Sequence, residues 1–149
     1  MSSDSVPAQD AGPVGPDAAD IATIEAVGKL TEALETVEVA RGHLYAFHQL
    51  TGSADFALDD AIELLDRAGH REFAADVSRR LRGRNVLPGR WTYQVIEDYE
   101  DTYYQVFRDF ERRGRQLVGG HRHAYEAELK RRRRTPGEPG HEAGPDELA

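Results

Sequence analysis

The sequence predicts an all-α protein with four helices. Apolar residues recur at three- and four-residue spacings through the central part of the chain, and no segment alternates apolar and polar residues long enough to form a strand. Clusters of glycine and proline separate these periodic segments, as expected at helix ends. A chain of 149 residues is long enough to bury a core. We therefore expect one helical domain, residues 19–134.

Both ends of the chain differ in composition from this domain. Residues 1–18 and 135–149 are rich in proline, glycine, alanine and acidic residues, and they offer little apolar surface to bury. The sequence thus predicts a disordered acidic N-terminal segment and a disordered C-terminal tail. The first segment has neither the positive charge nor the apolar stretch of a secretory signal. The expected location is therefore the cytoplasm.

The first predicted helix is long. It begins near Asp17 or Asp20, since either side chain can cap a helix N-terminus, and it ends at Gly52. Ser53 then provides an N-cap for a second helix, whose apolar side is rich in alanine. Gly69 is expected to end that helix. The alanines predict close packing.

The last two predicted helices flank a turn. A third, short helix over about 70–81 is expected to bury Phe73, Val77 and Leu81. Residues 83–90 contain a proline and glycines and predict a turn. The fourth helix begins near Trp91. Its apolar seam alternates spacings of four and three residues, as in a coiled coil: Thr92, Ile96, Tyr99, Tyr103, Val106, Phe110, Arg113 and Leu117.

The first and fourth helices are much longer than the two between them. The simplest arrangement is a long antiparallel helical hairpin with the two short helices at one end. Gly119 and Gly120 either end the fourth helix or bend it. Because so long a hairpin exposes much of its surface, we expect a homo-oligomer, specifically a dimer.

Polar residues interrupt the apolar side of the first helix within the stretch RGHLYAFHQLTG. At ~100° per residue, Arg41, Tyr45 and His48 fall on or beside the buried face, whereas His43 points away. An arginine placed there needs a partner, because an uncompensated interior charge is costly. The start of the fourth helix can provide one.

A closed polar network is the first hypothesis for these residues. Arg41 pairs with Asp98 or Glu100, and His48 forms a hydrogen bond with Thr92 or Tyr99. Such contacts would lock the register between the two helices. The sequence favours this structural role.

A pocket for a small anionic ligand is the alternative. The arginine would bind the anion while the tyrosines and the histidine orient it. Its residues would be Arg41, Tyr45, His48, Tyr99 and Tyr103, with Asp98 and Glu100 at the edges.

The motifs of several enzyme classes are missing. The chain has no cysteine, which excludes disulfides, thiolate zinc sites and cysteine nucleophiles. It has no phosphate-binding glycine loop, no serine nucleophile elbow and no His-Glu-x-x-His. The lone Glu-x-x-His, Glu138 to His141, lies in the predicted tail, so a di-iron pair is not expected. We expect no catalysis, no cofactor and no metal.

The charge distribution bears on partners. A net charge of −8 argues against binding to nucleic acid or to anionic membranes. No apolar run approaches the ~18 residues of a membrane span. The basic block at residues 130–134 could attract nucleic acid despite the net negative charge. Nucleic-acid surfaces usually add aromatic residues that stack on bases, and only Tyr125 lies near this block in the sequence. We expect neither nucleic acid nor membrane as a partner.

Trp91 is the single tryptophan of the chain. It anchors the short helices at a hinge, or it serves as a hot spot for a protein partner. The predicted function is a soluble, non-catalytic protein-interaction or scaffold module with an unidentified partner. The alternative function is binding of a small anionic ligand between the first and fourth helices.

Three runs, RGHLYAFHQLTG, GRNVLPGRWTYQVIEDY and LVGGHRHAYEAELKRRRRTPG, resemble small all-helical proteins of GC-rich actinobacteria that carry no assigned function. The resemblance covers most of residues 25–140. It implies a helical fold and no activity, so no catalytic residue is carried over from it.

Overall fold

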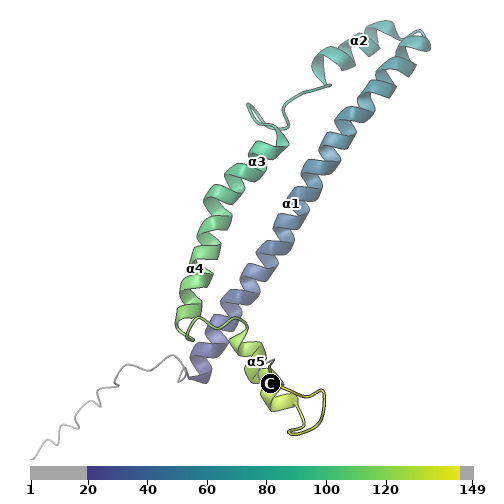
Figure 1. Cartoon of the computed structure of the whole chain (residues 1–149). Coiled ribbons are helices and arrows are strands. Elements are labelled where there is room, and N and C mark those ends of the chain that lie inside the picture. Colours follow the sequence, from purple (N-terminus) through teal and green to yellow (C-terminus); the bar gives the residue numbers. More distant parts are fainter. Residues whose placement is uncertain (1–19, 145–149) are drawn as a thin grey trace, which may run out of the picture. The chain divides into compact units, whose positions relative to one another are not determined.

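The computed structural model describes residues 20–144, and this part of the chain is helical without a strand. Its helices are α1 (Ile21–Arg67), α2 (Arg71–Arg80), a third that joins α3 (Thr92–Tyr99), η1 (Glu100–Tyr104) and α4 (Gln105–Gln116), and α5 (Ala124–Arg133) (Figure 1). The predicted all-α class with four helices is confirmed. The predicted disorder of residues 1–18 concerns a segment outside the described residues.

The described residues divide into two compact units. One contains residues 35–107, and the other contains residues 20–34 and 108–144. In the first unit α1 runs antiparallel to α3 and η1, because Glu38 contacts Tyr104 whereas His48, further along α1, contacts Thr92. In the second unit Thr31 of α1 contacts Glu111 of α4. The long hairpin of the whole chain stays a prediction.

The start of α1 agrees with its predicted cap. The Asp20 carboxylate accepts a hydrogen bond of 2.7 Å from the Thr23 backbone N–H, one of the donors that the first helical turn leaves free. This bond lowers the pKa of Asp20. Asp20 therefore caps the helix in its charged form.

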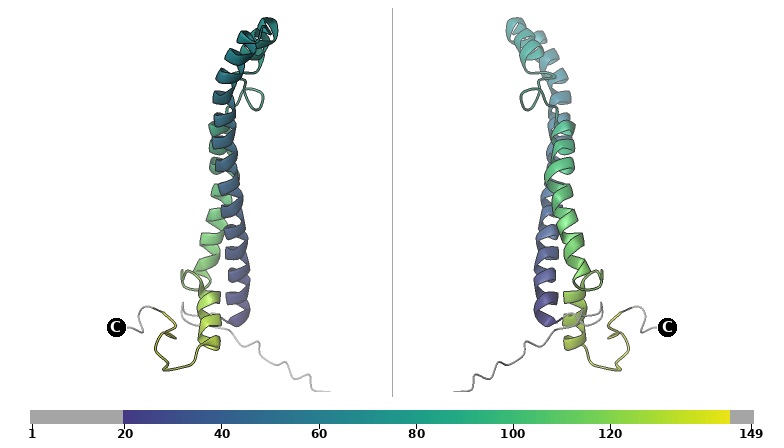
Figure 2. Two further views of the ribbon diagram at one scale, coloured as in Figure 1. Left: turned by 90° about the vertical axis from the view of Figure 1, so that its right-hand side faces the viewer. Right: turned by 90° about the vertical axis from the view of Figure 1, so that its left-hand side faces the viewer.

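The predicted break at Gly52 is wrong. The helix α1 runs through this residue, from Ile21 to Arg67, as one helix of 47 residues, about 70 Å at the rise of an α-helix, and α1 is drawn as one continuous coil (Figures 1 and 2). Ser53 does not cap a new helix, because its hydroxyl donates to the Gln49 carbonyl at 3.0 Å. A glycine inside a helix costs only about 1 kcal/mol relative to alanine, so it does not by itself end one.

The short helix α2 lies where it was predicted, but it buries other residues. Gly69 precedes it with φ 91°, a left-handed conformation that glycine adopts without strain. Ala74 is the buried residue of α2, whereas Phe73 and Leu81 are exposed. The expected burial of these two side chains is therefore wrong, because the close contact is made by the small alanine.

A π-helix changes the register of the third helix. The Gln105 N–H bonds to the Glu100 carbonyl, five residues back rather than four, which inserts one extra residue into the helical repeat. The buried positions follow this insertion: Ile96 and Tyr104 are eight residues apart, and Glu111 and Val118 then follow at intervals of seven. The face that packs inward is thus displaced by one residue after η1.

The predicted seam of this helix is consequently wrong from Tyr103 onward. Tyr103, Val106, Phe110 and Leu117 are between 54% and 65% exposed, although their spacing is that of a buried seam. Arg113 is exposed as well. The helix ends at Gln116, and Gly119 and Gly120 adopt positive φ angles of 70° and 77°. The two glycines therefore end the helix rather than bend it.

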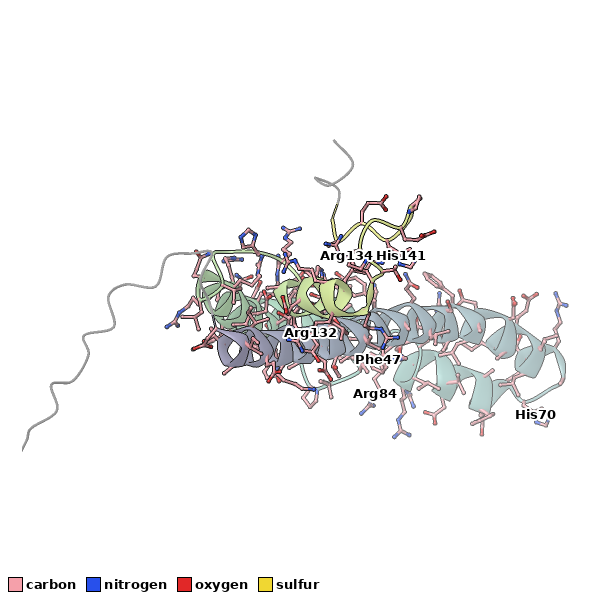
Figure 3. All side chains as sticks on the ribbon, turned by 90° about the horizontal axis from the view of Figure 1, so that it is seen from below. Phe47, His70, Arg84, Arg132, Arg134 and His141 are labelled. Carbon is pink, nitrogen blue, oxygen red and sulfur yellow. The ribbon has the colours of Figure 1, made fainter. Side chains whose placement is uncertain are left out.

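After α5 the described chain forms turns. The Glu138 N–H bonds to the Thr135 carbonyl at 3.2 Å, and the His141 N–H bonds to the Glu138 carbonyl at 3.1 Å. The His141 ring also accepts a hydrogen bond from the Thr135 N–H at 3.2 Å, and Figure 3 labels Arg134 and His141 on this segment. Residues 135–144 contain no helix or strand.

Candidate functional site

The most connected polar cluster of the first unit is centred on Glu100, the first residue of η1. Arg41 donates to Glu100 Oε1 from Nε at 3.0 Å and from Nη2 at 2.8 Å. The Tyr45 hydroxyl donates to the same oxygen at 2.9 Å. One carboxylate oxygen therefore accepts three hydrogen bonds, all from residues of α1.

Two aromatic rings surround the Arg41 guanidinium. Its central carbon lies 5.1 Å from the centroid of the Tyr45 ring and 4.8 Å from that of Tyr104, both within the range of a cation–π contact. The buried Tyr104 in turn donates its hydroxyl proton to Glu38 Oε1 at 2.6 Å. The cluster thus links α1 to η1 through charge, hydrogen bonds and aromatic contact.

The protonation states of the cluster follow from these contacts. The hydrogen bond from Arg41, reinforced by that from Tyr45, lowers the pKa of Glu100. The hydrogen bond to Glu100 raises the pKa of Arg41 and also raises the pKa of Tyr45. At neutral pH the ion pair is charged and Tyr45 keeps its proton. An anionic ligand at Arg41 would have to displace Glu100, so this geometry favours a structural lock.

Two predicted members of the site lie elsewhere. Asp98 accepts a hydrogen bond of 2.6 Å from Arg90 Nε and does not contact Arg41. Tyr103 is 55% exposed, and its ring packs 5.7 Å from that of Tyr99 and 6.0 Å from that of Phe107. The π-helix turns Tyr103 outward and brings its neighbour, Tyr104, inward.

Sequence reasoning missed two members of the cluster, Glu38 and Tyr104. Tyr99 belongs to it only through stacking, since its ring centroid lies 6.4 Å from that of Tyr104. The one signal in the sequence is the pair of adjacent tyrosines, Tyr103 and Tyr104, of which either can face α1. The choice between them depends on the extra residue of η1, which spacing alone does not reveal.

His48 forms a second link between α1 and α3. Its Nδ1 lies 2.6 Å from the hydroxyl oxygen of Thr92, the first residue of α3. The Trp91 backbone N–H donates to the Gln94 side-chain oxygen at 3.0 Å, which satisfies a free donor at the same helix start. Together these bonds fix where α3 begins.

An apolar groove with a volume of about 700 Å³ lies beside this helix start. Its walls come from the middle of α1, the end of α2 and the connection to α3, and they include Gly52, Phe56, Leu58, Leu81, Trp91 and Tyr93. Trp91 is 58% exposed and packs edge-on against Tyr93 with ring centroids 5.7 Å apart. The tryptophan is therefore a groove wall rather than a buried anchor.

In the second unit the notable polar residue is Glu111, which is only 5% exposed. Its carboxylate accepts a hydrogen bond of 3.1 Å from the Thr31 hydroxyl and another of 3.1 Å from Arg115 Nε. The sequence did not single out this residue, because the predicted register placed Phe110 in its position. Its two bonds compensate the charge that burial would otherwise leave unsatisfied.

The basic block lies at the end of α5. Arg131 and Arg132 donate to opposite oxygens of Glu128 at 3.3 Å and 3.2 Å, and Figure 3 labels Arg132 on this helix. These bonds, first of all the one from Arg132, lower the pKa of Glu128. Two of the arginines therefore share one carboxylate, whose single negative charge offsets one of their two positive charges. The exclusion of nucleic acid stays a prediction.

Comparison of the chain with protein-family models, with curated proteins and with solved structures finds no match in any of the three. No helix among the described residues combines the length and the apolar character needed to span a membrane.

The acid stability of the protein tests the Arg41 cluster. The lowered pKa of Glu100 means that the unfolded chain takes up this proton first as the pH falls below the ordinary value of 4.5. This stabilisation is complete above that value and is lost as the pH falls through the lower pKa of the folded state. We expect the free energy of unfolding of Arg41→Met to lack most of this decrease at acid pH, as measured by denaturant titrations between pH 3 and 7.

A double variant provides the control. Arg41→Met/Glu100→Gln should be more stable at pH 7 than Arg41→Met alone, since it leaves no carboxylate without its cation. If the free energy of unfolding decreases equally at acid pH in Arg41→Met and in the wild type, the Arg41–Glu100 pair does not contribute to acid stability.

Proposed function

We propose that this chain is a non-catalytic protein-interaction module that acts as a homodimer through one face of its third helix. The observation that carries this proposal is an exposed apolar stripe that begins in η1, runs along α4 and ends in the turn after it. We call its members the α4 stripe: Tyr103, Val106, Phe110 and Leu117. Each is more than half exposed, and their spacing of three, four and seven residues repeats as in a coiled coil.

An apolar stripe with this spacing is normally covered by another helix. Within the described residues the inward face of the same helix is a different one, formed by Tyr104 and Glu111 and continued by Val118 in the turn after α4. The helix thus presents two apolar faces, and its own chain buries one of them. The remaining face supports the proposal of an external helical partner.

A second copy of this chain is the partner that the stripe fits. In a two-fold dimer the same surface serves on both sides, so a seam of heptad spacing is complementary to itself. Arg113 would fall within this seam, and its guanidinium carbon lies 4.8 Å above the Phe110 ring. Its charge can thus reach the edge of the contact while its stem covers apolar surface.

The polar clusters support a role without catalysis. The donors of Arg41 and Tyr45 are directed at Glu100, and Glu111 is held by Thr31 and Arg115. A catalytic group needs a free atom directed at a substrate, whereas these groups satisfy one another. Their geometry suits the fixing of helix register.

Sedimentation equilibrium at tens of micromolar tests the dimer. We expect the wild type to sediment as a dimer and Phe110→Glu as a monomer. Two carboxylates placed in the seam should raise the dissociation constant by about 100-fold or more, since each polar group buried without a partner costs ~1–3 kcal/mol.

Phe73→Glu is the matched control, because Phe73 is 60% exposed on α2, outside the stripe. It should leave the dimer intact. A wild type that sediments as a monomer over this concentration range refutes the proposal.

A further inference from the structure

Gly52 forms part of the wall of the groove beside Trp91. A Cβ atom built on this glycine would meet no heavy atom within 4 Å, although Gly52 lies inside α1 and lines the groove. Glycine at a helix interior is otherwise unfavourable by about 1 kcal/mol relative to alanine. Its presence here leaves room in the groove that any other side chain would occupy.

The walls of the groove suit a flat apolar body. Phe56, Trp91 and Tyr93 are 77%, 58% and 42% exposed, and they stand on two different segments, α1 and the start of α3. Leu58 and Leu81 add aliphatic surface to the lining. A volume of about 700 Å³ falls within the ~300–1,000 Å³ of small-molecule sites.

The acidic and basic side chains of the lining are His48, Asp55 and Arg84, and two of them already have a hydrogen-bond partner. Asp55 accepts a hydrogen bond of 2.7 Å from the Gly83 backbone N–H. His48 Nδ1 contacts Thr92. The side chain of the third group, Arg84, has no such partner among the described residues.

Arg84 is the cation that remains available. Its neighbours in the chain are paired, Arg82 with Asp59 at 2.7 Å and Arg90 with Asp98 at 2.6 Å. Within residues 20–144 the Arg84 side chain forms no hydrogen bond or ion pair, and Figure 3 labels it on the connecting segment. An unpaired guanidinium on an aromatic groove is complementary to a ligand with an aromatic body and one negative charge.

We propose that this groove binds a small aromatic carboxylate. The ring of the ligand packs among Phe56, Trp91 and Tyr93, and its carboxylate accepts hydrogen bonds from Arg84. This site goes beyond the proposed dimer function, and it shares no residue with the α4 stripe. The two proposals can therefore fail independently.

The single tryptophan of the chain reports directly on the groove. We would titrate the full-length protein with 3-phenylpropanoate, excite at a wavelength that only Trp91 absorbs, and follow its emission. The uncharged analogue 3-phenylpropan-1-ol has the same aromatic body. We expect a saturable change with the acid and binding of the alcohol weaker by about tenfold or more, the value of a charge-assisted hydrogen bond.

Gly52→Leu tests the location of the site, because leucine would fill the groove from its wall and is itself a good helix former. This variant should fold and should lose the saturable change. Gly42→Leu is the matched control: its Cβ also meets no heavy atom within 4 Å, and Gly42 is exposed on the same helix. It should bind as the wild type does.

Arg84→Gln tests the charge, and it should bind the acid and the alcohol about equally. The monomerising variant Phe110→Glu should bind 3-phenylpropanoate as the wild type does, whatever the outcome of sedimentation. No saturable change in the wild type, or equal binding by Gly52→Leu, would refute the site. A wild type that binds the alcohol as tightly as the acid would refute the carboxylate specificity.

Discussion

Replacing Arg115 with methionine should lower the free energy of unfolding by about 3 kcal/mol, at the lower end of the cost of breaking a buried ion pair. Glu111 is 5% exposed and would lose its cation, and among the described residues the Thr31 hydroxyl at 3.1 Å would be its remaining donor. The Arg115 side chain is 21% exposed, so water can partly replace it. Chemical denaturation at pH 7 measures the loss.

The double variant Glu111→Leu/Arg115→Met distinguishes the pair from simple packing. Replacing a buried ion pair by apolar residues of similar size is often neutral or stabilising, so the double variant should recover to within about 1 kcal/mol of the wild type. Arg112→Met is the control, since the Arg112–Asp109 pair is about half exposed and such pairs contribute ~1 kcal/mol or less. A double variant as unstable as Arg115→Met would show that the charge is not the cause.

Gly28→Ala and Gly42→Ala should change stability in opposite directions. A Cβ on Gly28 would lie 2.7 Å from Cβ and 2.9 Å from Cγ of Tyr125, and the Tyr125 Cβ cannot move without a shift of the α5 backbone. We expect a loss of roughly 1–3 kcal/mol, the cost of overpacking. Gly42→Ala meets nothing within 4 Å and should gain up to ~1 kcal/mol from helix propensity.

Thermal unfolding shows whether each variant is more or less stable than the wild type. Hydrogen exchange shows which part of the chain is affected. In Gly28→Ala the amides of α5 should exchange faster than in the wild type, because α5 must move away from α1. Amides at the middle of α1 should be unaffected in either variant. If both alanine variants are stabilised, the close approach between Gly28 and Tyr125 is not rigid.

Part of the polar cluster followed from sequence reasoning alone. The helical periodicity of α1 placed Arg41, Tyr45 and His48 on one side, and the need of an arginine for a carboxylate pointed to Asp98 or Glu100. The structure pairs Arg41 with Glu100 and His48 with Thr92. It assigns Asp98 to Arg90, because two carboxylates two residues apart face different sides of a helix.

The break predicted at Gly52 shows a limit of local signals. A glycine followed by a serine resembles a helix end followed by an N-cap, yet the energy at stake is only about 1 kcal/mol. Contacts on both sides of this point hold the helix instead. Asp55, three residues after Gly52, accepts a hydrogen bond of 2.7 Å from the Gly83 backbone N–H. Because Gly83 is distant in the sequence, local patterns could not predict this contact.

The sequence by itself determined that this chain is helical, that Asp20 can cap the start of α1, where α2 lies, and that Arg41, Tyr45 and His48 share one side of α1, because these depend on local periodicity and capping. Only the tertiary structure decided which face of the third helix turns inward. Tyr103 and Tyr104, like Phe110 and Glu111, are adjacent, and both registers contain apolar residues at heptad spacing. The extra residue of η1 rotates the helix by ~100°, so that Tyr104 contacts Glu38 and Glu111 contacts Thr31. Packing against α1 makes that choice, and it leaves the α4 stripe exposed.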